Sequence, residues 1–207
     1  MISVEAQRII YENNLPVDIV PFGGISGTDR AIAWPPEHEV KMDVLGFDEA
    51  YAHSLPVRLE SNPEFEIYFA SPAGWALLKI IAWDDRGDEA RVKDAHDLAV
   101  ILRAYADAGN QDRLYEREAA LLADEGFDLK YAGARLLGRD ISDIVGQGSR
   151  GRILKILARE TREGGKYQLA LDMWQRKALG PEEFEENLML LRKLYQGIKE
   201  VAFTDEG

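Results

Sequence analysis

Residues 71–98 read SPAGWALLKIIAWDDRGDEARVKDAHDL, and this stretch combines the clearest helix signals with a dense set of charged side chains. Ser71 followed by Pro72 is typical of a helix start, because serine caps free backbone amides and proline fits the first helical position. The helix should continue through the apolar segment to the polar break after Trp83. A second helix should run from about residue 90 to residue 107, so the stretch predicts a pair of neighbouring helices.

Apolar side chains at helical spacing predict which faces of the two helices are buried. We expect these residues to lie in the core: Trp75, Leu78, Ile81 and Ala82 in the first helix, and Val92, Ala95, Ala99 and Leu102 in the second. The charged residues should then point away from the core, toward a shared surface.

The charged side chains of these helices form a candidate site. Lys79 and Arg86 are seven residues apart, which is two helical turns, so they fall on the same side of the first helix. Lys93 and Asp97 have the spacing of an i,i+4 pair, with Asp94 one position further round. Cations beside carboxylates are suited to holding and orienting a triphosphate. Alternatively, Lys93–Asp97 is an ordinary surface pair and Lys79 only extends out of an apolar helix.

Upstream, the segments QRIIYE and LPVDIVPF flank the turn-prone pair Asn13-Asn14 and predict a β-hairpin. The second segment resembles a buried strand, yet Asp18 lies at its centre. A buried lone carboxylate is costly unless it is paired, hydrogen-bonded or bound to a cation. The alternative is that Asp18 faces water on a half-exposed strand. Further along, FDEAYAHS predicts a short helix, and LPVRLE and FEIYFA predict strands.

From about residue 111 onward the pattern is helical, with glycines between the helical stretches. The predicted helices lie near residues 111–124, 128–146, 150–162, 167–178 and 181–199. We therefore predict an α+β fold. Residues 1–108 should form a domain with a small mixed β-sheet flanked by helices, and residues 109–207 an all-helical domain.

Composition narrows the classes of function. The 207 residues carry a net charge of −12, and such an acidic surface repels phosphate backbones, although a local basic patch can still hold a nucleotide or an RNA end. The absence of cysteine excludes disulfides, thiolate zinc sites and cysteine nucleophiles. The three histidines lack metal-binding spacing, and GGISG lacks the lysine of a P-loop. With no signal peptide and no apolar run long enough to span a bilayer, we expect a cytoplasmic protein without a membrane partner.

Three motifs occur in order: VDIVPF around Asp18, K-x-x-A-x-x-x-R from Lys79 to Arg86, and K-D-x-x-D-L from Lys93 to Leu98. Together they resemble the AbiEii-type nucleotidyltransferases, a branch of the polymerase-β-like nucleotidyltransferase superfamily. The resemblance covers roughly residues 6–107. It implies magnesium-dependent transfer of a nucleotide from a nucleoside triphosphate to an acceptor. Some members of that family are toxins of toxin–antitoxin or phage-defence pairs, and some modify tRNA ends.

The resemblance also assigns roles to residues. Asp18 matches the third of three carboxylates that hold two metal ions, so Asp18 would be a metal ligand and, with Lys79, a catalytic residue. The residues that would bind the nucleotide are Lys79, Arg86, Lys93, Asp94 and Asp97. We expect all of these side chains to cluster in one cleft.

The sequence departs from the family pattern at its start. The family's first motif is a Gly-Ser turn followed by an Asp-x-Asp strand that supplies two metal ligands, and the 17 residues before Asp18 contain neither. Gly148-Ser149 is no substitute, because no Asp-x-Asp strand follows it. One carboxylate cannot hold two magnesium ions in the required geometry. Three explanations stay open: Met1 is an internal methionine of a longer enzyme, a truncated protein keeps the fold for binding, or a partner chain supplies the strand.

The sequence thus predicts a nucleotidyltransferase-like protein whose transfer to tRNA or protein is weak or absent in this chain. The alternative is a non-catalytic remnant that binds a nucleotide or a protein partner. The absence of a first strand and helix would leave an unpaired sheet edge and apolar surface, which proteins normally cover. The exposed edge predicts pairing with a second copy of the chain or with another protein, and the family resemblance implies an antitoxin as that other protein.

Overall fold

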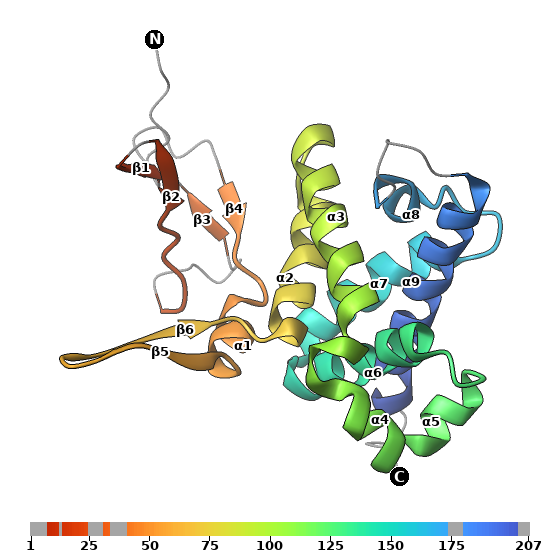
Figure 1. Cartoon of the computed structure of the whole chain (residues 1–207). Coiled ribbons are helices and arrows are strands. Elements are labelled where there is room, and N and C mark those ends of the chain that lie inside the picture. The colour runs from red at the N-terminus through yellow and green to blue at the C-terminus, as the bar shows by residue number, and fades with distance from the viewer. Residues whose placement is uncertain (1–7, 13, 25–30, 34–40, 174–179, 203–207) are drawn as a thin grey trace.

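The computed structural model describes residues 8–12, 14–24, 31–33, 41–173 and 180–202. The strands lie on one side of the molecule and most of the helices on the other, with α2 (Pro72–Asp85) and α3 (Asp88–Ala104) next to the strands (Figure 1). The candidate site therefore lies where the two parts of the fold meet.

Three antiparallel two-stranded sheets make up the described β structure. They pair β1 (Arg8–Tyr11) with β2 (Leu15–Asp18), β3 (Ala31–Ala33) with β4 (Lys41–Asp43), and β5 (Leu55–Ser61) with β6 (Glu64–Phe69). The predicted first hairpin is confirmed, with Arg8 opposite Asp18 in the register. The strands predicted at LPVRLE and FEIYFA are confirmed as β5 and β6, which pair with each other, whereas β3 and β4 lie in segments for which no strand was predicted.

The remaining elements are helical, and the α+β class with a helical carboxy-terminal region is confirmed. Besides α2 and α3 they are α1 (Phe47–Ala52), η1 (Ala106–Asn110), α4 (Gln111–Glu116), α5 (Ala119–Asp124), α6 (Leu129–Ile144), α7 (Gln147–Thr161), α8 (Gln168–Asp172) and α9 (Pro181–Ala202). The start of α2 is as predicted: the Ser71 hydroxyl accepts a hydrogen bond of 3.2 Å from the Gly74 amide, and Pro72 takes the first helical position. Among the described residues, no helix combines the length and the apolar character that a membrane span requires.

One apolar core runs through α2, α3 and the carboxy-terminal helices and includes Leu77, Leu98, Leu137 and Leu190. The apolar face predicted for α3 is confirmed at Ala95, Ala99 and Leu102, which are buried, whereas Val92 is only half-buried. The domain boundary predicted near residue 108 falls within η1 and stays a prediction.

The apolar face predicted for α2 is wrong in part. Trp75 is 46 % exposed, whereas Leu77 and Ile80 are fully buried. The helix is apolar on nearly every side, so the spacing of its apolar residues does not identify the buried face. The face is instead set by packing against the adjacent helix α3 and against α6 and α7, which lie further along the chain.

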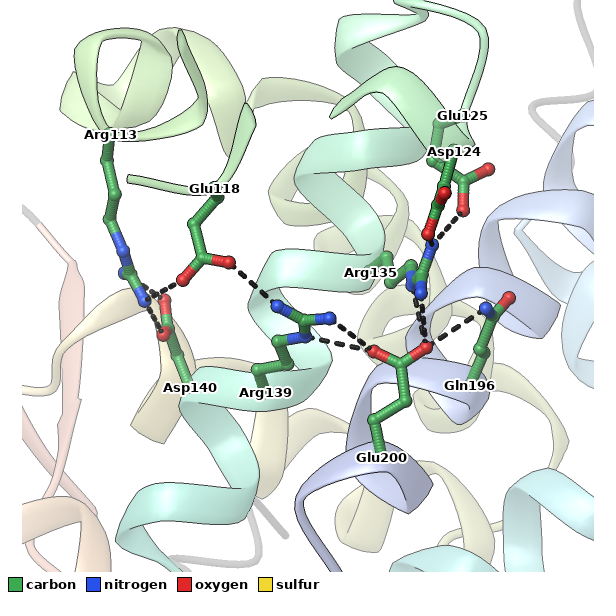
Figure 2. A network of polar contacts seen from close by, with 9 residues as sticks. All are labelled: Arg113, Glu118, Asp124, Glu125, Arg135, Arg139, Asp140, Gln196 and Glu200. Atoms are coloured by element: carbon green, nitrogen blue, oxygen red, sulfur yellow. Dashed lines mark hydrogen bonds and ion pairs between the residues drawn. The ribbon is translucent and has the colours of Figure 1, made fainter. Parts of the chain in front are cut away.

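Helices α6 and α9 cross in unusually close contact. A Cβ atom added at Gly138 would lie 2.3 Å from the Leu194 carbonyl oxygen, and one added at Gly197 would lie 2.0 Å from the Arg135 carbonyl oxygen. Figure 2 shows the charge network around this crossing, in which the Glu200 carboxylate contacts Arg135 at 2.6 Å and Arg139 at 2.8 Å. Glycines therefore let α6 and α9 approach closely, and ion pairs join the two helices beside the apolar core.

The first two strands are more exposed than expected. Every described residue of β1 and β2 is exposed, so the prediction that Asp18 lies in a buried strand is wrong. A two-stranded hairpin leaves both faces open unless another layer covers them, and no described residue forms such a layer here. The alternative interpretation, a half-exposed strand, matches the Asp18 side chain, which is 44 % exposed.

Candidate functional site

Helices α2 and α3 bring four of the predicted site residues into direct contact. Lys79 Nζ lies 2.9 Å from Asp94 Oδ1 and 2.6 Å from Asp97 Oδ2. Arg86 Nη1 lies 2.9 Å from Asp94 Oδ2. The two cations are two turns apart on one side of α2, as their spacing predicts, and both contact α3.

Asp94 is the centre of this cluster, because each of its carboxylate oxygens accepts a hydrogen bond from a different cation. Its side chain is only 1 % exposed, whereas Arg86 is 45 % exposed. The Arg86 amide closes α2 by donating to the Ala82 carbonyl oxygen, after which the chain turns at Gly87 and returns as α3. Asp94 thus fixes the Arg86 guanidinium at the surface.

The Lys79 ammonium is stabilised in its charged form. Burial lowers its pKa, but hydrogen bonds to Asp94 and Asp97, with the charges of both carboxylates, raise the pKa by more. The net effect is a pKa above the ordinary value, so Lys79 keeps its proton at neutral pH. A lysine in this state is a fixed positive charge and no general base.

Asp18 lies on the neighbouring hairpin and not in direct contact with the α2–α3 cluster. Its two oxygens accept hydrogen bonds of 2.7 and 2.9 Å from Arg8 on the paired strand. The hydrogen bond from Arg8 lowers the pKa of Asp18 most strongly and burial opposes it, while the charges of Arg8, Arg86 and Lys93 lower the pKa further by smaller amounts. Asp18 is therefore close enough to Arg86 and Lys93 to be influenced by both charges.

The predicted Lys93–Asp97 pair does not form. Asp97 contacts Lys79 on α2 instead, and Lys93 is exposed and makes no ion pair with any residue that the structure describes. A cross-helix contact at 2.6 Å replaces the local pair because Asp97 points toward α2. Of the three predicted site cations, Arg86 and Lys93 are thus more open to solvent than Lys79.

A second charged cluster beside this site was not predicted from the sequence. Asp84 contacts Arg152 and Arg159 of α7, each at 2.7 Å, and Asp85 contacts Arg152 at 2.7 Å. The acidic pair at the end of α2 was the available signal. Its partners lie at least 67 residues further along the chain, so no local spacing reveals them.

The family described as "Nucleotidyl transferase AbiEii toxin, Type IV TA system" matches residues 7–188. The chain belongs to the AbiEii family. The match includes all three motifs and extends from the predicted range into the helical region as far as α9. No curated protein and no solved structure matches the sequence.

Membership of the AbiEii family implies a divalent metal, and the described residues do not fit a two-ion centre. Both oxygens of Asp18 already face the Arg8 guanidinium, which competes with a cation for the same lone pairs. Within the described ranges, no three acidic or histidine side chains are grouped so that they could hold a metal ion. His38, one of the three histidines, lies outside the described residues.

Proposed function

We propose that this AbiEii-family chain binds a nucleoside triphosphate at the surface formed by Arg86 and Lys93, with nucleotide transfer as its family reaction. In that reaction an acceptor hydroxyl, on RNA or protein, bonds to the α-phosphorus. Pyrophosphate leaves and the hydroxyl proton is lost to water. With one carboxylate of the metal-binding set, transfer by this chain is weak, because metal-held oxygens normally supply several kcal/mol of transition-state stabilisation.

The observation that carries this proposal is the position of Arg86. Its guanidinium is fixed by buried Asp94, remains open to solvent, and carries a charge that acts on Asp18. A pre-positioned guanidinium binds phosphate with little loss of side-chain entropy. Lys93 adds a second accessible cation. Lys79 is a third, less exposed positive charge, which Asp94 and Asp97 hold in place.

The second candidate function is a binding module without catalysis. It is favoured by the Arg8–Asp18 pair, which occupies the carboxylate that a metal would need. In this case the same surface holds a nucleotide, or a protein partner covers the exposed hairpins. The candidate partners, an antitoxin or a second copy of the chain, remain proposals. A chemical assay separates the two functions.

Titration of the full chain with each nucleoside triphosphate tests the binding step, read by calorimetry. We expect Lys93→Gln to weaken binding about tenfold, the effect of losing one hydrogen bond to a charged group. Lys155→Gln is the matched control, since Lys155 is exposed on α7, outside the site. Equal affinities for the two variants and the unmodified chain would refute the assignment.

Incubation with labelled triphosphates, magnesium and a tRNA pool tests the transfer step. Label on RNA or on the protein that disappears in Asp18→Ala supports weak family catalysis. Binding without any label transfer supports the binding module. Strong transfer that survives Asp18→Ala would contradict the proposed role of Asp18.

A further inference from the structure

A cavity of about 430 Å³ lies between the end of α2, the start of α3, and the turn that joins α7 to α8. Its walls include five cationic side chains, which is an unusual concentration in a chain with a net charge of −12. These are Arg86, Arg91, Arg159, Arg162 and Lys166. Only two acidic side chains, Asp84 and Glu160, line the same cavity.

One wall of the cavity is held by hydrogen bonds and an ion pair. Trp83 Nε1 and Arg91 Nε each donate a hydrogen bond of 2.9 Å to Asp172 Oδ2. Arg159 lies over the Trp83 ring at 5.7 Å and contacts Asp84 at 2.7 Å. These contacts partly neutralise Arg91 and Arg159 and hold their side chains in place.

The mouth of the cavity is formed by the turn after α7. Buried Glu160 accepts a hydrogen bond of 3.1 Å from the Leu169 amide, and the Tyr167 hydroxyl oxygen accepts one of 2.9 Å from the Gly164 amide. These bonds fix the turn that carries Arg162 and Lys166. Both of these cations are exposed, and neither forms an ion pair with a described residue.

We propose that this cavity, here called the α7–α8 pocket, binds a phosphate group carried by a nucleotide or by an RNA end. Several guanidinium groups around one small space suit the tetrahedral, multiply charged phosphate, which accepts paired hydrogen bonds from arginine. Two cations at the mouth lack acidic partners in the described structure, so an anion would compensate them. The binding step does not depend on nucleotide transfer.

Arg86 gives the pocket a direct connection to the α2–α3 site. The same side chain lines the cavity and donates to Asp94. A phosphate in the pocket therefore lies beside the surface formed by Arg86 and Lys93. The acceptor strand of an RNA, or a second phosphate of a nucleotide, would extend from one site to the other.

The test uses the full chain and the double variant Arg162→Gln/Lys166→Gln. Its matched control is Arg117→Gln/Lys155→Gln, which removes the same two residue types from exposed positions outside the pocket. Binding of inorganic phosphate, of a nucleoside triphosphate, and of a short single-stranded RNA is measured at several salt concentrations without magnesium. Circular dichroism establishes that both variants are folded.

We expect the pocket variant to bind at least one of these probes about tenfold more weakly than the control, with a shallower salt dependence. A loss confined to the triphosphate identifies a nucleotide as the source of the phosphate, and a loss for RNA identifies an RNA end. If the pocket variant and the control bind every probe equally, the pocket is no phosphate site. Because Lys79, Lys93 and Asp18 are unchanged, that failure leaves the proposed function intact.

Discussion

Lys79 Nζ on α2 lies 2.9 Å from Oδ1 of Asp94 on α3, and this Asp94 side chain is almost completely buried. The second oxygen of Asp94 holds Arg86 at the other end of the same helical face. One carboxylate thus determines both the packing of α2 on α3 and the position of the most accessible guanidinium of the candidate site.

Replacing Asp94 should therefore affect stability as well as binding. Asp94→Asn leaves two cations without their shared carboxylate, and we expect the free energy of unfolding to fall by about 3 kcal/mol, as for other broken buried pairs. The ion pair between Lys79 and Asp97 remains in this variant, which limits the fall in the free energy of unfolding. Urea denaturation followed by circular dichroism measures the change.

Asp97→Asn provides the comparison, because the Asp97 side chain is 31 % exposed and water replaces part of its interaction with Lys79. The free energy of unfolding of Asp97→Asn should therefore fall by about 1 kcal/mol or less. Equal losses for the two variants would contradict the central position of Asp94.

The close approach of α6 and α9 can be tested by replacing a glycine at their crossing. Alanine normally stabilises a helix by up to about 1 kcal/mol relative to glycine. At Gly197 the new Cβ would lie 2.0 Å from the Arg135 carbonyl oxygen, so the helices must separate. We expect Gly197→Ala to lower the free energy of unfolding by about 2 kcal/mol or more despite the propensity gain.

Gly151→Ala in α7 is the matched control, because no atom lies within 4 Å of the added Cβ. This variant should be as stable as the unmodified chain or more stable. Thermal denaturation of both variants measures the contrast. A stabilised Gly197→Ala variant would show that α6 and α9 pack further apart than described.

Local signals in the sequence predicted the parts of the fold that depend on neighbouring residues. Ser71-Pro72 marked the start of α2, and the spacing of Ala95, Ala99 and Leu102 marked the buried face of α3. The prediction of the buried face of α2 was wrong in part, because a helix that is apolar on nearly every side has no distinct apolar stripe. Burial on α2 is decided by its packing against α3 and against the more distant helices α6 and α7.

The candidate site shows the same division. The two-turn spacing of Lys79 and Arg86 correctly placed both on one side of α2. The partner of Asp97 was missed, because a contact with the neighbouring helix replaced the local i,i+4 pair. The α7–α8 pocket could not be predicted, since Arg86 and Arg162 are brought together only by the packing of α7 on α2.

Asp43 at the end of β4 lies beside Asp85 at the end of α2, so the stability of the protein should depend on pH through these two carboxyl groups. Burial raises the pKa of Asp85, and the charge of Asp43 raises it further, against the opposite effect of Arg152. A carboxyl with a raised pKa in the folded state stabilises the fold at low pH and loses that contribution as pH rises through the folded pKa.

Asp43→Asn removes the repulsion and keeps an oxygen that can accept from the Leu45 amide, as Asp43 does at 2.8 Å. We expect it to raise the free energy of unfolding by about 0.5 to 1 kcal/mol at pH 7, the scale of partly exposed charge pairs. The gain should disappear toward pH 3, below the ordinary aspartate pKa of about 3.9, because Asp85 is then largely protonated in the folded and the unfolded chain alike. Urea denaturation at the two pH values measures it, and a gain independent of pH would contradict the repulsion.

Tyr105 lies buried between α3 and η1, and its hydroxyl donates a hydrogen bond to Asp140, which also contacts Arg113 at 2.6 Å. Burial raises the pKa of Tyr105, and the bond to the Asp140 carboxylate raises it further. The folded state therefore keeps the phenol protonated at a pH where the unfolded chain loses that proton. The stabilisation is complete below about pH 10 and is lost as pH rises toward the folded pKa.

Tyr105→Phe should consequently lower the free energy of unfolding by about 1 to 2 kcal/mol at pH 7, through loss of a hydrogen bond to a charged group. Above pH 9 the unmodified chain releases the Tyr105 proton on unfolding, and Tyr105→Phe has no such proton to release. The free energies of unfolding of the two proteins should therefore approach each other by about 1.4 kcal/mol between pH 9 and pH 11. Guanidinium denaturation at several pH values measures this convergence. Tyr115→Phe is the control, since Tyr115 is 58 % exposed and water solvates its hydroxyl in both states. A constant difference for Tyr105→Phe across this range would mean that the Tyr105–Asp140 bond does not hold the proton in the folded protein.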